Sequence, residues 1–386
     1  MAAEVAEWHV AACYVVCLYA GTWLLNMVLP GRRARGSATD CKGKQLEYKL
    51  NGLACVAVLL VVLYALTYLL PSIQLDFIII NFRACATVGC VIGVLASVCL
   101  HVAGDSWPGH VSAHEMTPSG SAVKRFFLGA ELNPRLLGLD IKMWLYLVGV
   151  FMVILNMVAS VVYCHHYSTT GLHPLFLLYV AEMLWFCFDY LIFEHIQLTT
   201  YDLFAENVGF KLAWGCIFFY PFFYPVGVWP LLPLPAETAT PVEQLQLFPG
   251  QCVVSAALFL GGWILSRGAN LQKYAFKTAV VKNRNRVFFI PQETIAGKLL
   301  ISGFWGLSRH INYLGEVMMA LAMAMCGGLA QPFSYRVLLP WLYPLYYVVL
   351  LVTRERDDNR RCAQKYGSLW AVYEKRVPYR IIPYIY

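Results

Sequence analysis

The sequence predicts an all-α, polytopic membrane protein, and both its composition and its apolar stretches support this fold class. Of the 386 residues, 59% are hydrophobic and only 13% are charged. Several apolar stretches are long enough to cross roughly 30 Å of hydrocarbon as helices. We therefore expect about nine or ten transmembrane helices, with spans near residues 10–30, 50–70, 77–103, 143–163, 174–193, 208–232, 251–266, 311–330 and 337–353.

Two amphipathic segments, near 268–305 and 355–380, are expected to lie at the membrane surface or to re-enter it. Polar and basic residues become dense after residue 266 and stay close to apolar runs. We therefore expect residues 1–266 to form a transmembrane scaffold and 267–386 to carry the site.

The distribution of Lys and Arg predicts how the chain is oriented in the membrane, because basic residues collect in cytoplasmic loops. The loop after the first span is rich in them, whereas residues 1–9, 71–76, 164–173 and 233–250 contain none. This alternation favours an odd number of spans with a cytosolic carboxyl terminus. It also accounts for most of the net charge of +7, with anionic lipids or an anionic ligand as further partners and no need for nucleic acid.

The thirteen cysteines are scattered singly and form no CxxC pair. No His/Cys spacing suits zinc, so we predict no metal site. The first apolar run has neither a basic region before it nor an evident cleavage site, and we expect it to be a retained helix.

The stretch GFWGLSRHINYLGE (303–316) places several polar residues at the start of an apolar run. If a helix begins near Leu307, Arg309, Asn312, Tyr313 and Glu316 share one face of it. Charged groups at membrane depth are costly and usually meet a partner or a water-filled cavity. An Arg-to-Glu pair that only anchors the helix remains an alternative.

Two further polar stripes follow the same helical spacing. Asn270, Lys273 and Lys277 lie at i, i+3 and i+7 in RGANLQKYAFK, where an orientation signal is the simpler alternative. Arg354, Asp358, Arg361 and Lys365 share one face of a helix that continues out of the last span, although a solvated helix with i,i+4 pairs would look similar.

Together the three stripes predict a cytosol-facing pocket for a polyanion. Lys and Arg would bind phosphates, and Trp305 or Tyr313 would stack on a ring. A nucleotide cofactor fits this description. Neither GxGxxG after a strand nor GxxxxGK[ST] occurs, so side chains on helices would have to hold it.

Three stretches carry a family resemblance: FFLGAELNPRLLGLDIKMW (126–144), LLISGFWGLSRHINYLGE (299–316) and CAQKYGSLWAVYEKRVPYRIIPYIY (362–386). They resemble the sterol reductase family, which includes the sterol Δ14-, Δ7- and Δ24(28)-reductases and the membrane domain of the lamin B receptor. The ELNPR element together with the RVPYRI-x-PYIY end looks most like the Δ14 branch, and the other two bonds stay open.

The resemblance implies a reductase of the endoplasmic reticulum, or of the inner membrane in a bacterium, that uses NADPH to reduce a sterol double bond. Carried over position by position, it implies a cofactor site made of residues from all three stripes and from the tail. These are Asn270, Lys273, Lys277, Trp305, Arg309, His310, Asn312, Tyr313, Arg354, Asp358, Lys365 and Tyr366.

The implied chemistry requires a protonated acid, because the alkene is protonated before hydride reaches the resulting carbocation. A carboxylic acid in an apolar site stays protonated near neutral pH. Asp358 is the first candidate, followed by Glu194, with Asp189 and Glu316 as further possibilities. Alternatively, Asp358 only pairs with Arg354 and cannot donate a proton.

Two other functions remain open. The tail also resembles isoprenylcysteine carboxyl methyltransferases, which hold S-adenosylmethionine, but those enzymes are shorter and lack ELNPR. A lamin-B-receptor-like chromatin tether would need a soluble amino-terminal domain, and only nine residues precede the first expected span.

Overall fold

The computed structural model describes residues 8–40, 42–70, 73–104, 121–168, 171–233, 250–278, 286–287, 290–329 and 335–386. Within these ranges, nine helical segments are long and apolar enough to cross a membrane, which confirms the all-α polytopic fold. They are Trp8–Val28, Gly52–Leu69, Phe82–Ala103, Ile141–Tyr167, Pro174–Ile192, Phe210–Leu231, Gln251–Lys277, Ile311–Gly328 and Arg336–Tyr366.

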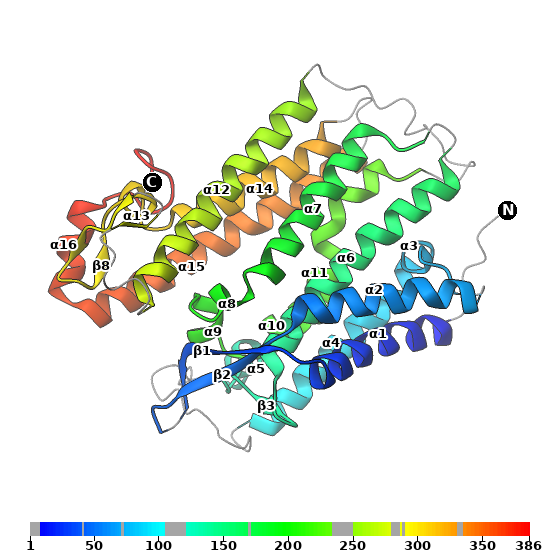
Figure 1. Cartoon of the computed structure of the whole chain (residues 1–386), viewed down its shortest axis with the longest axis horizontal. Coiled ribbons are helices and arrows are strands. Elements are labelled where there is room, and N and C mark those ends of the chain that lie inside the picture. Colours follow the sequence, from blue (N-terminus) through cyan, green and yellow to red (C-terminus); the bar gives the residue numbers. More distant parts are fainter. Residues whose placement is uncertain are drawn as a thin grey trace. The chain divides into compact units, whose positions relative to one another are not determined.

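The chain divides into two compact units (Figure 1). Unit 1 comprises Met1–Leu172 and Met183–Val226, and unit 2 comprises His173–Glu182 and Gly227–Tyr386. The scaffold (1–266) and site-bearing half (267–386) expected from the sequence are a functional division, and that division stays a prediction.

Unit 1 holds the first helices and two short hairpins; α7 begins in unit 2 and enters unit 1 at Met183, and the last 3₁₀ segment passes into unit 2 at Gly227. Its elements are α1 (Trp8–Val28), β1 (Arg32–Thr39), β2 (Gln45–Leu50), α2 (Gly52–Leu69), α3 (Phe77–Ile80), α4 (Phe82–Ala103), α5 (Ala122–Leu128), β3 (Arg135–Leu136), β4 (Leu139–Asp140), α6 (Ile141–Tyr167), α7 (Pro174–Ile192), α8 (Glu194–Gln197), α9 (Tyr201–Phe204), α10 (Phe210–Trp214), a π-helical turn (Gly215–Phe219), α11 (Tyr220–Phe223) and a 3₁₀ segment (Tyr224–Leu231).

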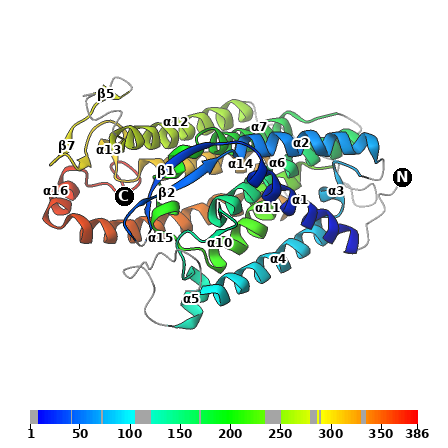
Figure 2. The ribbon, with the colours of Figure 1, turned by 60° about the horizontal axis from the view of Figure 1, so that its bottom comes forward.

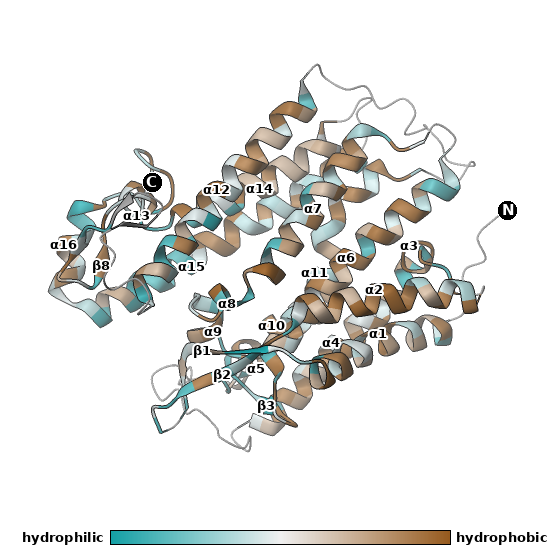
Figure 3. Cartoon of the chain, in the orientation of Figure 1, coloured by the Kyte–Doolittle hydropathy of each residue, from teal (hydrophilic) through white to brown (hydrophobic). Residues whose placement is uncertain are grey.

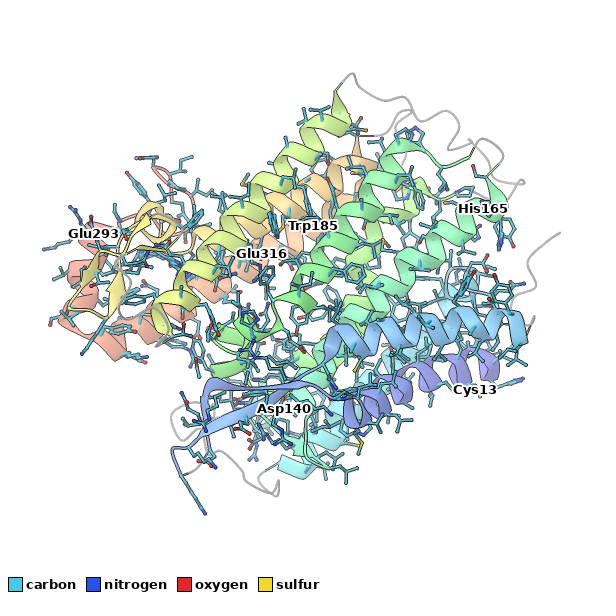
Figure 4. The ribbon with its side chains drawn as sticks, in the orientation of Figure 1. Cys13, Asp140, His165, Trp185, Glu293 and Glu316 are labelled. Carbon is cyan, nitrogen blue, oxygen red and sulfur yellow. The ribbon has the colours of Figure 1, made fainter. Side chains whose placement is uncertain are left out.

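The core of unit 1 centres on α6, whose side chains are mostly buried. Asp140, labelled in Figure 4, caps this helix by accepting a hydrogen bond from the Met143 amide at 3.0 Å. The fully buried Lys142 donates to the Asp202 and Glu206 carbonyl oxygens at 2.8 and 2.6 Å. In Figure 3, α2 is coloured hydrophobic over most of its length, as a helix exposed to lipid requires.

Unit 2 is a helical bundle with short strands and a small helix at one end (Figure 2). Its further elements are α12 (Gln251–Lys277), β5 (Arg286–Val287), β6 (Ile290–Pro291), β7 (Thr294–Ile295), β8 (Leu299–Leu300), α13 (Phe304–Leu307), α14 (Ile311–Gly328), a 3₁₀ segment (Tyr335–Trp341), α15 (Leu342–Tyr366) and α16 (Ser368–Arg376). Gly367, at a φ of 55°, separates α15 from α16 in a conformation that favours glycine.

Helices α12 and α14 lie side by side because glycines let their backbones meet. A Cβ atom built on Gly315 would lie 2.4 Å from the Gly262 carbonyl oxygen and 2.5 Å from the Ser266 amide nitrogen. Small residues at such crossings are typical of membrane helices. This contact fixes the spacing of the two helices that carry much of the expected site.

Two boundaries differ from the sequence-based expectation. The prediction that a helix begins near Leu307 is wrong, because α13 ends at Leu307 and α14 begins only at Ile311. Gly303, at a φ of 61°, and the extended Ser308 interrupt the helical backbone on either side of α13. Arg309 therefore precedes α14 instead of sharing its face with Asn312, Tyr313 and Glu316.

The expected surface segments are in part continuations of spans. Helix α12 runs unbroken to Lys277, and α15 runs to Tyr366. Figure 3 shows hydrophilic residues on the part of α15 nearest α16. Long helices thus carry polar residues from the bundle to its end, as expected for the third stripe.

Candidate functional site

The end of unit 2 formed by α13, α16 and the ends of α12 and α15 brings together most of the expected cofactor residues. Trp305 is buried, and its indole nitrogen donates to the Ala269 carbonyl oxygen at 2.8 Å. The Lys273 ammonium lies 4.8 Å from the centre of the Trp305 ring. The second stripe and the stretch around Trp305 therefore form one surface.

Three lysines and one carboxylate interact electrostatically at this surface. Lys277 is repelled by Lys273 and Lys365 and attracted by Asp358. Lys365 comes from α15 and lies 5.4 Å above the ring of Tyr366. Like charges gathered from two helices disfavour one another unless an anion joins them, so this cluster suits a polyanionic ligand.

Asn312 adds an unsatisfied polar atom to the same region. Its amide nitrogen donates to Asn270 Oδ1 at 3.3 Å, which links α14 to α12. Its own Oδ1 is buried and has no hydrogen-bond partner among the residues that the structure describes. A buried acceptor without a donor calls for an explanation, and a bound ligand with an N–H or O–H group would satisfy it.

His310 is buried beside Asp358. Its Nε2 atom lies 3.9 Å from Asp358 Oδ2, and its ring stacks on Tyr313 with centroids 4.8 Å apart. Burial lowers the pKa of His310 to about 4, although Asp358 opposes the shift. The imidazole is therefore neutral at pH 7 and does not neutralise the Asp358 carboxylate.

Arg309 is 5% exposed and is already engaged by protein groups. Its Nη1 atom donates to Glu374 Oε1 at 2.5 Å and to Asn359 Oδ1 at 3.0 Å. Its Nη2 atom donates to the Pro378 carbonyl oxygen at 3.3 Å. The structure thus places this guanidinium between α15, α16 and the tail, beside the lysine cluster but bound to the chain itself.

The remaining members of the third stripe are spread along α15. Arg354 is half-buried one turn before Asp358. Arg361 pairs with Asp357, at 2.6 Å between Nε and Oδ2. Tyr366 stacks on Trp370 of α16, with centroids 6.3 Å apart. Among the expected cofactor residues, Lys365 and Tyr366 thus reach the end of the bundle with Asp358.

Glu316 lies elsewhere in unit 2. Its Oε1 atom accepts a hydrogen bond from Ser266 Oγ at 2.5 Å, between α12 and α14. Figure 4 places it along the helices, away from Glu293 at the end of the bundle. The Arg-to-Glu pair of Arg309 is made with Glu374 of α16, a glutamate outside the expected stripe.

Glu194 belongs to unit 1 and has very different surroundings. It is 8% exposed, and its Oε2 atom accepts a weak hydrogen bond from the Gly52 amide at 3.4 Å. Burial raises the pKa of Glu194 to about 7, and the Gly52 contact only partly opposes this. A large fraction of this carboxylic acid is therefore protonated at neutral pH. Asp189 lies one turn away, half-buried.

Sequence reasoning missed four polar or aromatic residues around this end of unit 2. Gln272 is fully buried, accepts from the Phe304 amide at 3.1 Å and donates to the Ser302 carbonyl oxygen at 3.1 Å. Asn359 and Glu374 hold Arg309, and the buried Tyr373 interacts electrostatically with Arg309 and Asp358. Asn359 and Tyr373 lie within the amphipathic segment expected near 355–380. The spacing of residues along a helix, however, does not relate position 309 to position 374.

Comparison with known proteins identifies the family. The model of the "Ergosterol biosynthesis ERG4/ERG24 family" matches residues 1–386. The chain is 32% identical to the Delta(14)-sterol reductase of Arabidopsis thaliana over 370 residues, covering 93% of this chain and 91% of that protein. It is 33% identical to Delta(14)-sterol reductase erg24 of Schizosaccharomyces pombe, covering 92% and 80% of the two chains.

The likeness extends to a third organism at a similar level. The chain is 31% identical to Delta(14)-sterol reductase ERG24 of Saccharomyces cerevisiae over 386 residues, covering 96% of this chain and 83% of that protein. Both the family model and these relatives span the two units and the end of unit 2 described above. The chain therefore belongs to the ergosterol biosynthesis ERG4/ERG24 family.

Proposed function

We propose that the protein is an NADPH-dependent sterol reductase that reduces the Δ14 double bond in sterol biosynthesis. Relatives that are similar over more than nine-tenths of this chain are named Delta(14)-sterol reductases. The observation that carries the cofactor assignment is the gathering of Lys273, Lys277 and Lys365 around Asp358, next to Trp305.

The residues at this end of unit 2 fit NADPH by their chemistry. The three lysines suit the pyrophosphate and the 2′-phosphate of NADPH. A cationic methyl donor has no such phosphates. Trp305, His310 and Tyr313 offer aromatic surface, and the unsatisfied Asn312 Oδ1 suits an amide or hydroxyl donor. Arg354 and Tyr366 complete the proposed site from α15, and Arg309 acts by holding its neighbours.

NADPH, when bound, supplies a hydride. The chain must supply the proton, because protonation of the alkene creates the tertiary carbocation that accepts the hydride. A general acid works best when its pKa lies near the working pH. Glu194 meets this requirement through burial, and we assign it the proton donor role.

Asp358 is the competing donor, and its surroundings favour a different role. Its side chain is 20% exposed and lies near Lys277, within the lysine cluster where an anionic cofactor would bind. We therefore propose that Asp358 accepts hydrogen bonds from the bound cofactor and balances the lysine cluster.

The proposed location is the endoplasmic reticulum membrane, or the inner membrane in a bacterium, with the carboxyl terminus in the cytosol. Nine apolar helices within the part of the chain that the structure describes make this a multi-pass membrane protein. A cytosolic lysine cluster would meet NADPH directly, and the basic loops follow the same orientation.

The test is expression in a yeast strain that lacks its own Δ14-sterol reductase, with sterols measured by mass spectrometry. We expect the normal sterol profile to return with the wild-type chain and not with Glu194→Gln. Loss of the Δ7 or Δ24(28) double bond instead would reassign the substrate. A purified chain that binds S-adenosylmethionine and no NADPH would favour the methyltransferase alternative and refute this proposal.

A further inference from the structure

The segment before α14 is held by the carboxyl-terminal tail at several points. The Arg309 amide donates to the Tyr379 carbonyl oxygen at 2.9 Å, and the His310 amide donates to the Arg380 carbonyl oxygen at 2.8 Å. Ser308 Oγ donates to the Ile381 carbonyl oxygen at 2.8 Å. Three consecutive residues are thus bonded to three consecutive residues of the tail.

Two ion pairs fasten this junction to the helices around it. Glu374 of α16 binds the buried Arg309, which also binds Asn359 of α15. Arg380 of the tail donates to Glu355 Oε2 at 3.4 Å, and the Glu355 side chain is fully buried in α15. Removing one partner of such a pair leaves a buried charge uncompensated, so each pair constrains the other groups strongly.

The residues fixed in this way continue directly into the proposed cofactor site. His310 follows Arg309 and faces Asp358, and Asn312 and Tyr313 occupy the first turn of α14. Because Ser308 is extended and α13 has already ended, no helix holds Arg309 and His310 in register. The contacts with the tail and with Glu374 must do so.

We infer that Glu374, acting through Arg309, is a positioning residue that sets the affinity of the site for NADPH. The Glu374 side chain is 38% exposed and its Oε1 atom lies 2.5 Å from Arg309 Nη1, so its effect on the site would pass through Arg309. The inference rests on the proposed function, since it concerns how the same site is held.

The experiment measures NADPH binding by energy transfer from tryptophan, and sterol reduction at saturating NADPH, on the full chain in lipid nanodiscs. Glu374→Gln removes the charge and is expected to weaken NADPH binding about tenfold while the saturated rate changes less than about twofold. Glu374→Asp restores the charge and should recover most of the affinity. Lys375→Gln is the matched control, because this neighbouring exposed residue of the same helix should leave both quantities unchanged.

A second variant guards against misfolding of Glu374→Gln. Ser308→Ala removes one bond to the tail and keeps the ion pair, and it should weaken NADPH binding in the same direction by about threefold. If both variants bind NADPH as the wild type does, or lose saturated rate without losing affinity, the positioning role is refuted. A wild-type chain that binds no NADPH would instead refute the proposed function.

Discussion

The two carboxylic acids predicted from the sequence as proton donors, Asp358 and Glu194, differ in burial and in the charges around them. Asp358 is one-fifth exposed and lies among Lys273, Lys277 and Lys365 at the end of unit 2. Glu194 is buried in unit 1, with the Gly52 amide as its one hydrogen-bond partner among the described contacts. Cations keep a carboxylate charged, whereas burial without a cation keeps it protonated.

On the basis of this difference we propose separate roles for two residues of the same chemical class. Recognition of an anionic cofactor needs charges that converge, and the spacing of charged residues on helices reveals them. Proton donation needs an absence of charge and water around one acid. This lack of charge and water results from how the chain packs, so it can be recognised only in the tertiary structure.

The largest effects are expected from removing each of the two acids by mutation. Glu194→Gln should lower the rate of sterol reduction by about 10²–10⁴-fold and leave NADPH binding intact, because it removes a general acid. Asp358→Asn should weaken NADPH binding and retain measurable reduction at saturating cofactor. Single-turnover rates and binding titrations on both variants decide the matter, and the reverse pattern would make Asp358 the donor.

The lysine cluster should produce the next largest effect. Lys273→Ala or Lys277→Ala is expected to weaken NADPH binding by about 10–100-fold, the range for loss of a hydrogen bond between charged groups. If these lysines bind the 2′-phosphate, NADH affinity should change much less. Arg356→Gln, an exposed residue of α15, serves as the control, and equal losses for NADPH and NADH would place the lysines on the pyrophosphate.

The pH dependence of the reaction tests the acid assignment without a change in site residues. Because the pKa of Glu194 is about 7, the rate at saturating substrates should fall about tenfold per pH unit above neutrality. Below pH 7 the rate should level off. His310, whose pKa is about 4, does not titrate in this range, so a flat profile from pH 6 to 9 would exclude Glu194 as the donor.

The same shift has a consequence for stability, with a defined sign. The folded chain holds the Glu194 proton more tightly than the unfolded chain, so the stabilisation is full below the ordinary carboxyl pKa and is lost as pH rises through 7. Thermal unfolding from pH 5 to 8 should show this decline in the wild type. Glu194→Gln should lack that component, whereas an identical decline in both would attribute it to other groups.

The smallest effect expected is structural and concerns the glycine contact in unit 2. Gly315→Ala places a methyl group against the Gly262 carbonyl oxygen and should destabilise the bundle by about 1–3 kcal/mol. Gly261→Ala is the matched control, because its new Cβ would meet only the flexible end of Met318, 3.6 Å away. Unfolding midpoints that shift equally would show that the helices can separate without cost.

The fold was predictable from the sequence because lipid imposes a simple rule on composition. Apolar runs of sufficient length located the nine spans that lie within the described residues. The stripe with Lys273 and Lys277 and the separate stripe with Lys365 anticipated residues that the structure brings together. Such patterns can be read from the sequence because each depends on residues within a few helical turns of one another.

What the sequence did not predict depends on contacts between distant residues. The break at Ser308 removed Arg309 from the expected helical face, and its partners Asn359 and Glu374 lie 50 and 65 positions further along the chain. The raised pKa of Glu194 follows from burial, which the residues next to it in the sequence do not reveal. Long-range pairing explains why the partners of Arg309 were not predicted, and desolvation explains why the raised pKa of Glu194 was not.

The length of α12 has a mechanical consequence. Its 27 residues form one rod of about 40 Å, longer than a hydrocarbon core of about 30 Å, and the rod ends in Lys273 and Lys277. A thicker bilayer would cover more of this rod and bring the two ammonium groups closer to the headgroups, while a thinner one would raise them into water. Under the proposed function, NADPH binding would depend on membrane thickness, and so on the sterol content that the product of the reaction helps to set.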